Sequence, residues 1–450
     1  MPNTMLLARF STHVQKPLYR NAYAWLLSTG ISSILGLLYW ILAPRFYSRE
    51  AVGFNAAVVS IMILIAGISQ LNLMSALVRF IPNAGSKTAH LTAYSYLISM
   101  LLALVASAVF IVLCAQWTAL DFLGSDSKFA ILFILATMAW TVFNLQDGVL
   151  SGLRAAVWVP VDNIGYGIAK IALMIFLAPL NPRLGIFASW IVPTVLLLPP
   201  INLLIFRRLI PRHIQATKDR ASPLRWREIS RYVGSNYLSS LFALASSRLL
   251  PVLVVAVVGA TGGAYFYPAW AIADSLRLVT AQMATSLTVE GAIDDLNVTV
   301  DGSAFLLLLF GLFVPLVVVL VLAAPFILRL SGQDYVVKAV DVLRLLSIAV
   351  IPSLVVTWYV SIARVRHCLV EILFAEGFQA VLVLGLSYLL LRPYGVTGVG
   401  IASLVSATVV ACTLLPQLRS LLLPLQKQSG LENDIAAETV VGGPASSKRS

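Results

Sequence analysis

The sequence predicts an all-helical integral membrane protein with about twelve transmembrane helices, and three observations support this fold class. Of 450 residues, 59% are hydrophobic and only 11% are charged, whereas soluble domains carry about 25% charged residues. The mean hydropathy is +0.91. About twelve apolar runs reach the roughly 20 residues that a helix needs to cross a hydrocarbon core about 30 Å thick. The runs lack the alternation of a barrel strand, so we expect helices.

The expected spans follow one another with short connections. In chain order they are residues 21–43, 53–77, 91–115, 128–151, 158–178, 184–206, 233–258, 264–288, 303–325, 340–363, 368–391 and 395–418. Charged or helix-breaking residues separate successive runs, namely Arg49, Arg79, Asp126, Arg154, Arg183, Arg208, Gly259, Asp294, Arg329, Arg364 and Arg392. The first run follows basic residues as a secretory signal does, but it is long enough to span and ends without a small-residue cleavage pattern.

The basic residues of alternate loops predict the orientation. One set of loops, which includes both termini, holds about 20 Lys and Arg, against about seven in the other set. We therefore expect both termini on the cytoplasmic side. The net charge of +12 belongs to these loops and to the bundle interior, and does not indicate a nucleic-acid partner.

The chain divides into two halves that resemble each other. We expect an N-terminal six-helix lobe over 1–206, a basic cytoplasmic linker over 207–232, a C-terminal six-helix lobe over 233–423 and a disordered cytoplasmic tail over 424–450. Short matches recur at offsets of roughly 208 to 214 residues, such as 53–54 with 264–265 and 151–154 with 361–364. Since each half has an even number of spans, the copies are related by a two-fold axis along the membrane normal.

Ionisable residues at mid-span depth carry the candidate site. Each costs about 2.5 to 3.5 kcal/mol facing lipid on the mildest scale, so such residues usually face a bundle interior or a wet cavity. The basic candidates for a cationic lumen that binds an anionic substrate are Arg248, Arg277, Lys170 and Arg344. Arg248 has no carboxylate one turn away on its own helix, which favours it as the cation free for substrate.

Five acidic residues are candidates for ion coupling or for structural pairing. Asp274 lies three residues before Arg277 on one helix face, either as part of a cavity wall or as a buried pair that satisfies itself. Asp162 lies eight residues before Lys170 and could pair with it two turns apart on one helix face. The others, nearer the expected cytoplasmic ends, could couple H⁺ or Na⁺ or be solvated helix ends; they are Asp147, Glu371 and Glu376.

The motifs that the chain lacks narrow its function. It contains no GxxxxGK[ST] phosphate loop, no HExxH and no GxSxG, and its cysteines, Cys114, Cys368 and Cys412, lack CxxC spacing. We therefore expect no enzyme, no metal site and no cofactor, apart from possible H⁺ or Na⁺ coupling.

Several short motifs carry a resemblance to a known group. They are residues 46–54 (FYSREAVGF), 78–82 (VRFIP), 148–154 (GVLSGLR), 330–335 (LSGQDY) and 395–402 (GVTGVGIA). On these the chain, from about residue 20 to 418, resembles the polysaccharide transporter (Wzx-like flippase) group of the multidrug/oligosaccharidyl-lipid/polysaccharide exporter superfamily. The resemblance implies a two-lobed, V-shaped bundle like that of multidrug and toxic compound extrusion (MATE) proteins, with a cationic cavity.

The same resemblance implies a function, a location and partners. The function is translocation of undecaprenyl-pyrophosphate-linked oligosaccharide across the bacterial inner membrane, for O-antigen, capsule or exopolysaccharide biosynthesis. The partners are the lipid-linked oligosaccharide, membrane lipids and other polysaccharide-assembly membrane proteins. Two alternatives stay open: a cation-coupled multidrug antiporter, and a membrane-embedded polymerase or ligase of lipid-linked glycans. The polymerase or ligase usually needs a sizeable outer loop, and the outer loops expected here are short.

Overall fold

The computed structural model describes residues 17–114, 126–218, 226–291, 300–366 and 368–417. Its helices are α2 (Pro17–Phe46), α3 (Arg49–Ser69), α4 (Leu73–Phe80), η1 (Ile81–Asn83), η2 (Gly85–Lys87), α5 (Thr88–Cys114), α7 (Ser127–Gly152), α8 (Trp158–Leu177), α9 (Gly185–Leu204), η3 (Ile205–Leu209), α10 (Ile210–Ala216), α11 (Trp226–Val258), α12 (Ala260–Gly291), α13 (Val300–Arg329), α14 (Gln333–Val365), α15 (Leu369–Tyr394) and a final helix, Thr397–Gln417. The tail expected over 424–450 lies outside the described residues.

The long helices match the expected spans in number and place. Over the described ranges, twelve helices have 20 residues or more, and each covers most of one expected span. Ten of the described helices are long and apolar enough to cross a membrane. The exceptions are α2 and α12. In α2 the apolar stretch Gly30–Phe46 is shorter than the others, and α12 carries Asp274 and Arg277 in its middle. The all-helical membrane fold predicted from composition is confirmed.

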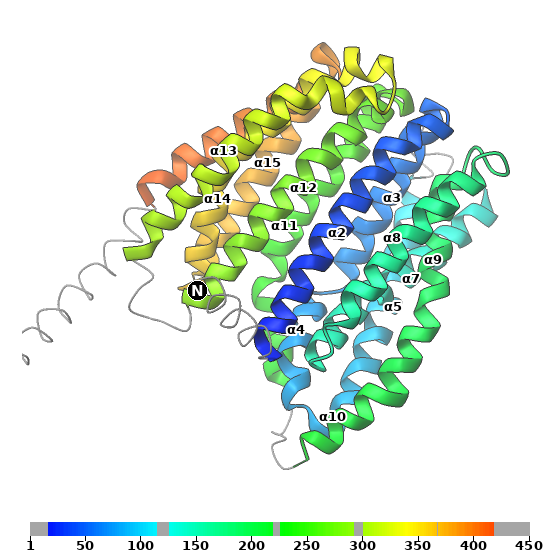
Figure 1. Cartoon of the computed structure of the whole chain (residues 1–450), viewed down its shortest axis with the longest axis vertical. Coiled ribbons are helices and arrows are strands. Elements are labelled where there is room, and N and C mark those ends of the chain that lie inside the picture. The colour runs from blue at the N-terminus through cyan, green and yellow to red at the C-terminus, as the bar shows by residue number, and fades with distance from the viewer. Residues whose placement is uncertain (1–16, 115–125, 219–225, 292–299, 367, 418–450) are drawn as a thin grey trace, which may run out of the picture.

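The helices form two lobes that meet along α2, α3, α11 and α12 (Figure 1). In the N-terminal lobe α2 packs on α8, α5 on α7, and α8 on α9. In the C-terminal lobe α12 and α13 pack on α14, and α11 packs on α15. Between the lobes α3 contacts both α11 and α12, and α2 contacts α12. On the outside, apolar side chains such as Val112, Leu307 and Phe326 are exposed, as lipid-facing residues are.

The lobes approach each other closely where α3 and α12 begin. A Cβ atom on Gly53 would lie 1.7 Å from the carbonyl oxygen of Ala260 and 2.8 Å from the backbone nitrogen of Ala264, so only glycine allows this approach. Gly53 and Ala264 are the repeat counterparts expected from sequence. Their contact agrees with a two-fold relation between the halves, because residues that lie on such an axis meet their own counterparts.

Polar contacts join the lobes at the same end of the bundle, which we call the Arg49 end (toward the top of Figure 1). Arg49 of α3 forms an ion pair with Asp334 of α14. Arg45, near the end of α2, donates to the carbonyl oxygens of Leu330 (2.5 Å) and Arg329 (3.0 Å) at the end of α13. The Ser331 hydroxyl donates to the carbonyl oxygen of Ile41 at 3.1 Å. This end therefore holds the two lobes together through both side chains and backbone.

Candidate functional site

A cavity of about 290 Å³ lies within the C-terminal lobe. Its wall comes from α11, α12, α14, α15 and the final helix, and most of it is formed by small and apolar side chains. Four ionisable residues line it, Asp274 and Arg277 on α12, Arg364 on α14 and Glu376 on α15. Hydroxyl and amide side chains add polar surface between them, from Ser246, Ser247, Ser353, Thr357, Ser361, Gln379 and Ser403.

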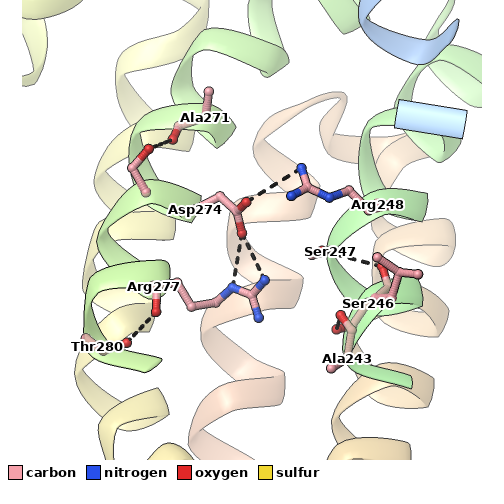
Figure 2. A network of polar contacts seen from close by, with 10 residues as sticks. Ala243, Ser246, Ser247, Arg248, Ala271, Asp274, Arg277 and Thr280 are labelled. Carbon is pink, nitrogen blue, oxygen red and sulfur yellow. Dashed lines mark hydrogen bonds and ion pairs between the residues drawn. The ribbon is translucent and has the colours of Figure 1, made fainter. Parts of the chain in front are cut away.

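Asp274, on the cavity wall, lies between the guanidinium groups of Arg248 and Arg277 (Figure 2). Its Oδ1 accepts hydrogen bonds from Nε of Arg277 at 3.1 Å and from Nη2 of the same guanidinium at 2.9 Å. Its Oδ2 lies 3.8 Å from Nη1 of Arg248, which reaches across from α11. The i,i+3 spacing on α12 brings the first pair together, and the packing of α11 on α12 supplies the second cation.

Arg248 therefore has a carboxylate at ion-pair distance on a neighbouring helix, although its own helix offers none one turn away, and it is not the fully free cation that the sequence favoured. The spacing along α11 could not show this, because the carboxylate comes from α12. The guanidinium of Arg248 also lies over the ring of Trp270, 5.3 Å from its centroid, which is a cation–π geometry. Its Nε is buried and has no hydrogen-bond partner among the described residues. Arg248 thus keeps donor capacity that Asp274 does not use.

A second ion pair lies further along the cavity. Nη2 of Arg364, in the last turn of α14, is 4.0 Å from Oε1 of Glu376 on α15. Glu376, expected either to couple an ion or to be a solvated helix end, lies on the cavity wall. Arg364 was expected only as a loop cation. Sequence alone gave no signal for this pair, since it depends on how α14 meets α15.

The charges in and around the cavity do not cancel. Three guanidinium groups, from Arg248, Arg277 and Arg364, face two carboxylates, from Asp274 and Glu376. The balance is one net positive charge in the described part of the site. The side chain of Arg277 is 44% exposed while that of Asp274 is only 7% exposed, so the cation faces the open space and the anion stands behind it.

Lys170 lies elsewhere, inside the N-terminal lobe. Its ammonium group lies over three aromatic rings, 4.2 Å from the centroid of Trp190, 4.9 Å from Tyr39 and 5.0 Å from Tyr166. The residue is only 5% exposed. The expected pairing with Asp162 is wrong: among the described residues, neither carboxylate oxygen of Asp162 has a hydrogen-bond partner, and the aromatic cage holds the cation instead.

The remaining candidates are scattered over both lobes. Asp147 of α7 accepts a hydrogen bond from the side-chain amide of Asn163 on α8 at 3.1 Å. Arg344 donates from Nε to the carbonyl oxygen of Val321 on α13 at 3.3 Å and does not line the cavity described above. Glu371 has one buried carboxylate oxygen without a hydrogen-bond partner in the described part of the chain. Of the residues singled out from the sequence, the structure groups Arg248, Arg277, Asp274 and Glu376 at or beside this cavity.

Comparison with known proteins identifies the fold. No protein-family model and no curated protein matches the chain. An inward-facing MATE family multidrug resistance transporter of the MOP superfamily aligns with a TM-score of 0.68 and 19% identity, over 89% of this chain and 95% of that one. An outward-facing MATE family multidrug resistance transporter of the same superfamily aligns with a TM-score of 0.62 and 18% identity, over 91% of this chain and 96% of that one.

A third solved structure differs in its pocket. It is a MOP superfamily transporter from Pyrococcus furiosus, described as having a binding pocket of reverse polarity that suggests a different function. It aligns with a TM-score of 0.65 and 16% identity, over 91% of this chain and 96% of that one. Because all these matches span nearly both chains, the chain has the two-lobed fold of MATE family transporters of the MOP superfamily.

Proposed function

We propose that the chain is a flippase that carries a polyprenyl-diphosphate-linked oligosaccharide between the leaflets of a bacterial inner membrane. The observation that carries the proposal is a cavity lined by Arg277 and Arg364, with Arg248 beside it on Asp274, so that three guanidinium groups face two carboxylates. Guanidinium forks match phosphate oxygens in geometry and in charge, and both interactions strengthen away from bulk water. The fold is that of transporters, which supports movement across the membrane rather than chemistry on the substrate.

The proposal assigns each part of such a substrate to a part of the protein. The diphosphate pairs with Arg277 and Arg248, and the sugar contacts the hydroxyl and amide groups of the cavity wall, such as Thr357 and Gln379. The polyprenyl tail stays in lipid. Rocking of one lobe against the other exposes the cavity to each side in turn.

The coupling ion, the orientation and the partners belong to the same proposal. We place both termini in the cytoplasm, on the strength of the basic loops. Protons or sodium ions are the proposed drive, and the candidate carriers are the carboxylates of Asp147, Asp162, Asp274, Glu371 and Glu376, of which Asp162 and Asp274 are buried. Membrane proteins that extend or ligate the glycan are the proposed partners.

A second candidate function is export of organic cations. It is favoured by the carboxylates of Asp274 and Glu376 and the ring of Trp270 on the wall of the same cavity, since such groups attract a lipophilic cation. The neighbours described as multidrug resistance transporters have the same fold. The charge balance of the described site favours the anionic substrate.

Binding to purified protein in nanodiscs distinguishes the two functions. Farnesyl diphosphate should bind and tetraphenylphosphonium should not, and Arg277→Gln should weaken farnesyl diphosphate binding by about tenfold or more. The matched control is Arg344→Gln, which removes a guanidinium that lies outside the cavity and should leave binding unchanged. Tight tetraphenylphosphonium binding without farnesyl diphosphate binding would establish the cation exporter instead.

Transport and gene deletion complete the test. In proteoliposomes the protein should move a fluorescent lipid-linked glycan to the opposite leaflet without changing its length. Formation of longer glycan chains would instead support a polymerase. Loss of one sugar polymer from the cell surface on deleting the gene would identify the natural substrate.

A further inference from the structure

The carboxylate of Asp274 occupies the position that an anionic headgroup would take between two cations. It accepts two hydrogen bonds from Arg277 through Oδ1, and Oδ2 lies 3.8 Å from Nη1 of Arg248 (Figure 2). Both guanidinium groups point from their own helices toward this one acid. The carboxylate thus imitates, with two oxygens, part of what a phosphate offers with three.

The two cations are only partly satisfied by Asp274. A guanidinium has five N–H donors, and Arg277 uses two of its nitrogens on Oδ1. Nη1 of Arg248 is too far from Oδ2 of Asp274 for a hydrogen bond, at 3.8 Å. The buried Nε of Arg248 has no hydrogen-bond partner among the described residues. A ligand with more acceptor oxygens and more charge would satisfy donors that the carboxylate leaves unpaired.

We infer that Asp274 is a resident counter-anion, which the substrate displaces from Arg277 and Arg248 and which recaptures them when the substrate leaves. This inference rests on the proposed function and adds a specificity-determining residue to it. Without the substrate, Asp274 supplies the counter-charge for the guanidinium groups of Arg277 and Arg248. With the substrate bound, the phosphoryl oxygens take over the guanidinium donors.

Only a ligand that binds the two arginines more strongly than Asp274 does can displace this carboxylate. A monoanion or a phosphate monoester must compete with a carboxylate that is already in place and is covalently part of the protein. A diphosphate carries two phosphoryl groups and can contact both guanidinium groups at once. Its interactions with the two arginines are therefore stronger than those of the carboxylate that it displaces. Asp274 therefore excludes the abundant small anions and admits ligands with a diphosphate.

The test compares inorganic pyrophosphate with inorganic phosphate on wild type and on Asp274→Asn, by calorimetry and by thermal shift. Asparagine keeps the size and one acceptor oxygen but removes the charge. Wild type should bind pyrophosphate and hardly bind phosphate. In Asp274→Asn the affinity for phosphate should rise by about tenfold or more, so that the preference for pyrophosphate falls. Flipping should slow, because nothing recaptures the cations when the substrate leaves.

A purely structural role for Asp274 predicts a different pattern. The variant would then lose thermal stability and bind both anions more weakly or equally, and this result would overturn the inference. The matched control is Asp341→Asn, which removes a carboxylate at an exposed position of α14 and should leave both affinities within about twofold.

The double variant Asp274→Asn with Arg248→Gln controls for misfolding caused by an unbalanced charge in the single variant. It removes one cation with the anion, so the three-residue cluster keeps its net charge of one. Arg277 is then free of its competitor but alone, and we expect phosphate to bind more tightly than in wild type with little preference for pyrophosphate. Unchanged phosphate affinity in this variant would count against the inference.

The proposed function and this inference fail in different ways. If wild type binds tetraphenylphosphonium and not pyrophosphate, the proposed function fails and the inference falls with it. If wild type binds pyrophosphate, and Asp274→Asn retains the wild-type preference for pyrophosphate over phosphate, only the role of Asp274 is overturned.

Discussion

The guanidinium of Arg49, the first residue of α3, forms an ion pair with the carboxylate of Asp334 in the first turn of α14, 285 positions later in the chain. Both side chains are about half exposed, at 51% and 53%, so the pair contributes only about 0 to 1 kcal/mol. Its importance lies in its place. It belongs to a set of interlobe contacts at the Arg49 end, where the lobes must part if the cavity is to open on that side.

Reversing one charge of this pair should favour separation of the lobes at the Arg49 end. Arg49→Asp places two carboxylates together and should shift the balance of conformations by about fivefold, roughly 1 kcal/mol. The readout is the thiol-labelling rate of Ser331→Cys, a buried position there, in a background without the native cysteines. Adding Asp334→Arg should restore slow labelling. Fast labelling of the double charge swap would show that the pair does not control this end.

The two arginines that share Asp274 should respond differently to replacement. Arg248→Gln leaves the hydrogen-bonded pair of Arg277 and Asp274 intact, so the protein should accumulate normally while flipping falls. Arg277→Gln leaves Asp274 with only the 3.8 Å contact to Arg248, so protein level should fall as well. Western blots beside the flipping assay measure both effects. Full flipping by Arg248→Gln at normal expression would remove this residue from the site.

Lys170 should be replaceable by a neutral side chain of similar length. The ammonium group is buried against three rings, and Lys170→Met keeps the packing while removing the desolvation cost of the charge. We expect the melting temperature to stay the same or rise and pyrophosphate binding to persist. Trp190→Ala, which removes one of the three rings around Lys170, should lower the melting temperature. Loss of pyrophosphate binding in Lys170→Met would place this cation on the substrate path.

Gly53 should not tolerate even one methyl group. A Cβ there would overlap the carbonyl of Ala260, so Gly53→Ala must push α3 away from α12. We expect a lower melting temperature and impaired flipping. The matched control is Gly165→Ala in α8, where a Cβ meets no atom within 4 Å and helix propensity favours alanine by about 0.5 to 1 kcal/mol. Equal stability of the two variants would contradict the close approach.

The orientation can be tested at the end of α10. Ala216 is exposed there, and a cysteine at this position should resist membrane-impermeant thiol reagents added to intact spheroplasts. Permeabilised cells should become labelled, which controls for reactivity. Labelling of intact spheroplasts would reverse the assignment of the two sides.

The sequence predicted the helices well because lipid imposes a simple rule on composition. A run such as 91–115 must be apolar over its whole length, and it forms α5 almost to the residue. The pairing of Asp274 with Arg277 was equally accessible, since residues three apart on a helix are neighbours. In both cases the evidence lies within one segment of chain.

Contacts between side chains of different helices could not be predicted from the sequence. The spacing of α11 gave no sign that Arg248 meets Asp274, and the two-turn spacing of Asp162 and Lys170 suggested a pair that does not form. Trp190 and Tyr39 come from other helices and surround Lys170 instead. Which faces meet depends on lobe packing, which hydrophobicity constrains only loosely in a chain that is apolar almost throughout.

The contact between Arg45 and the end of α13 bears on how this protein can vary among relatives. Arg45 donates to the backbone carbonyls of Arg329 and Leu330, and every residue type has a carbonyl to offer. Substitutions at those two positions therefore leave the contact in place, whereas a change at Arg45 removes both hydrogen bonds. In an alignment, position 45 should keep its arginine while positions 329 and 330 drift without covarying with it.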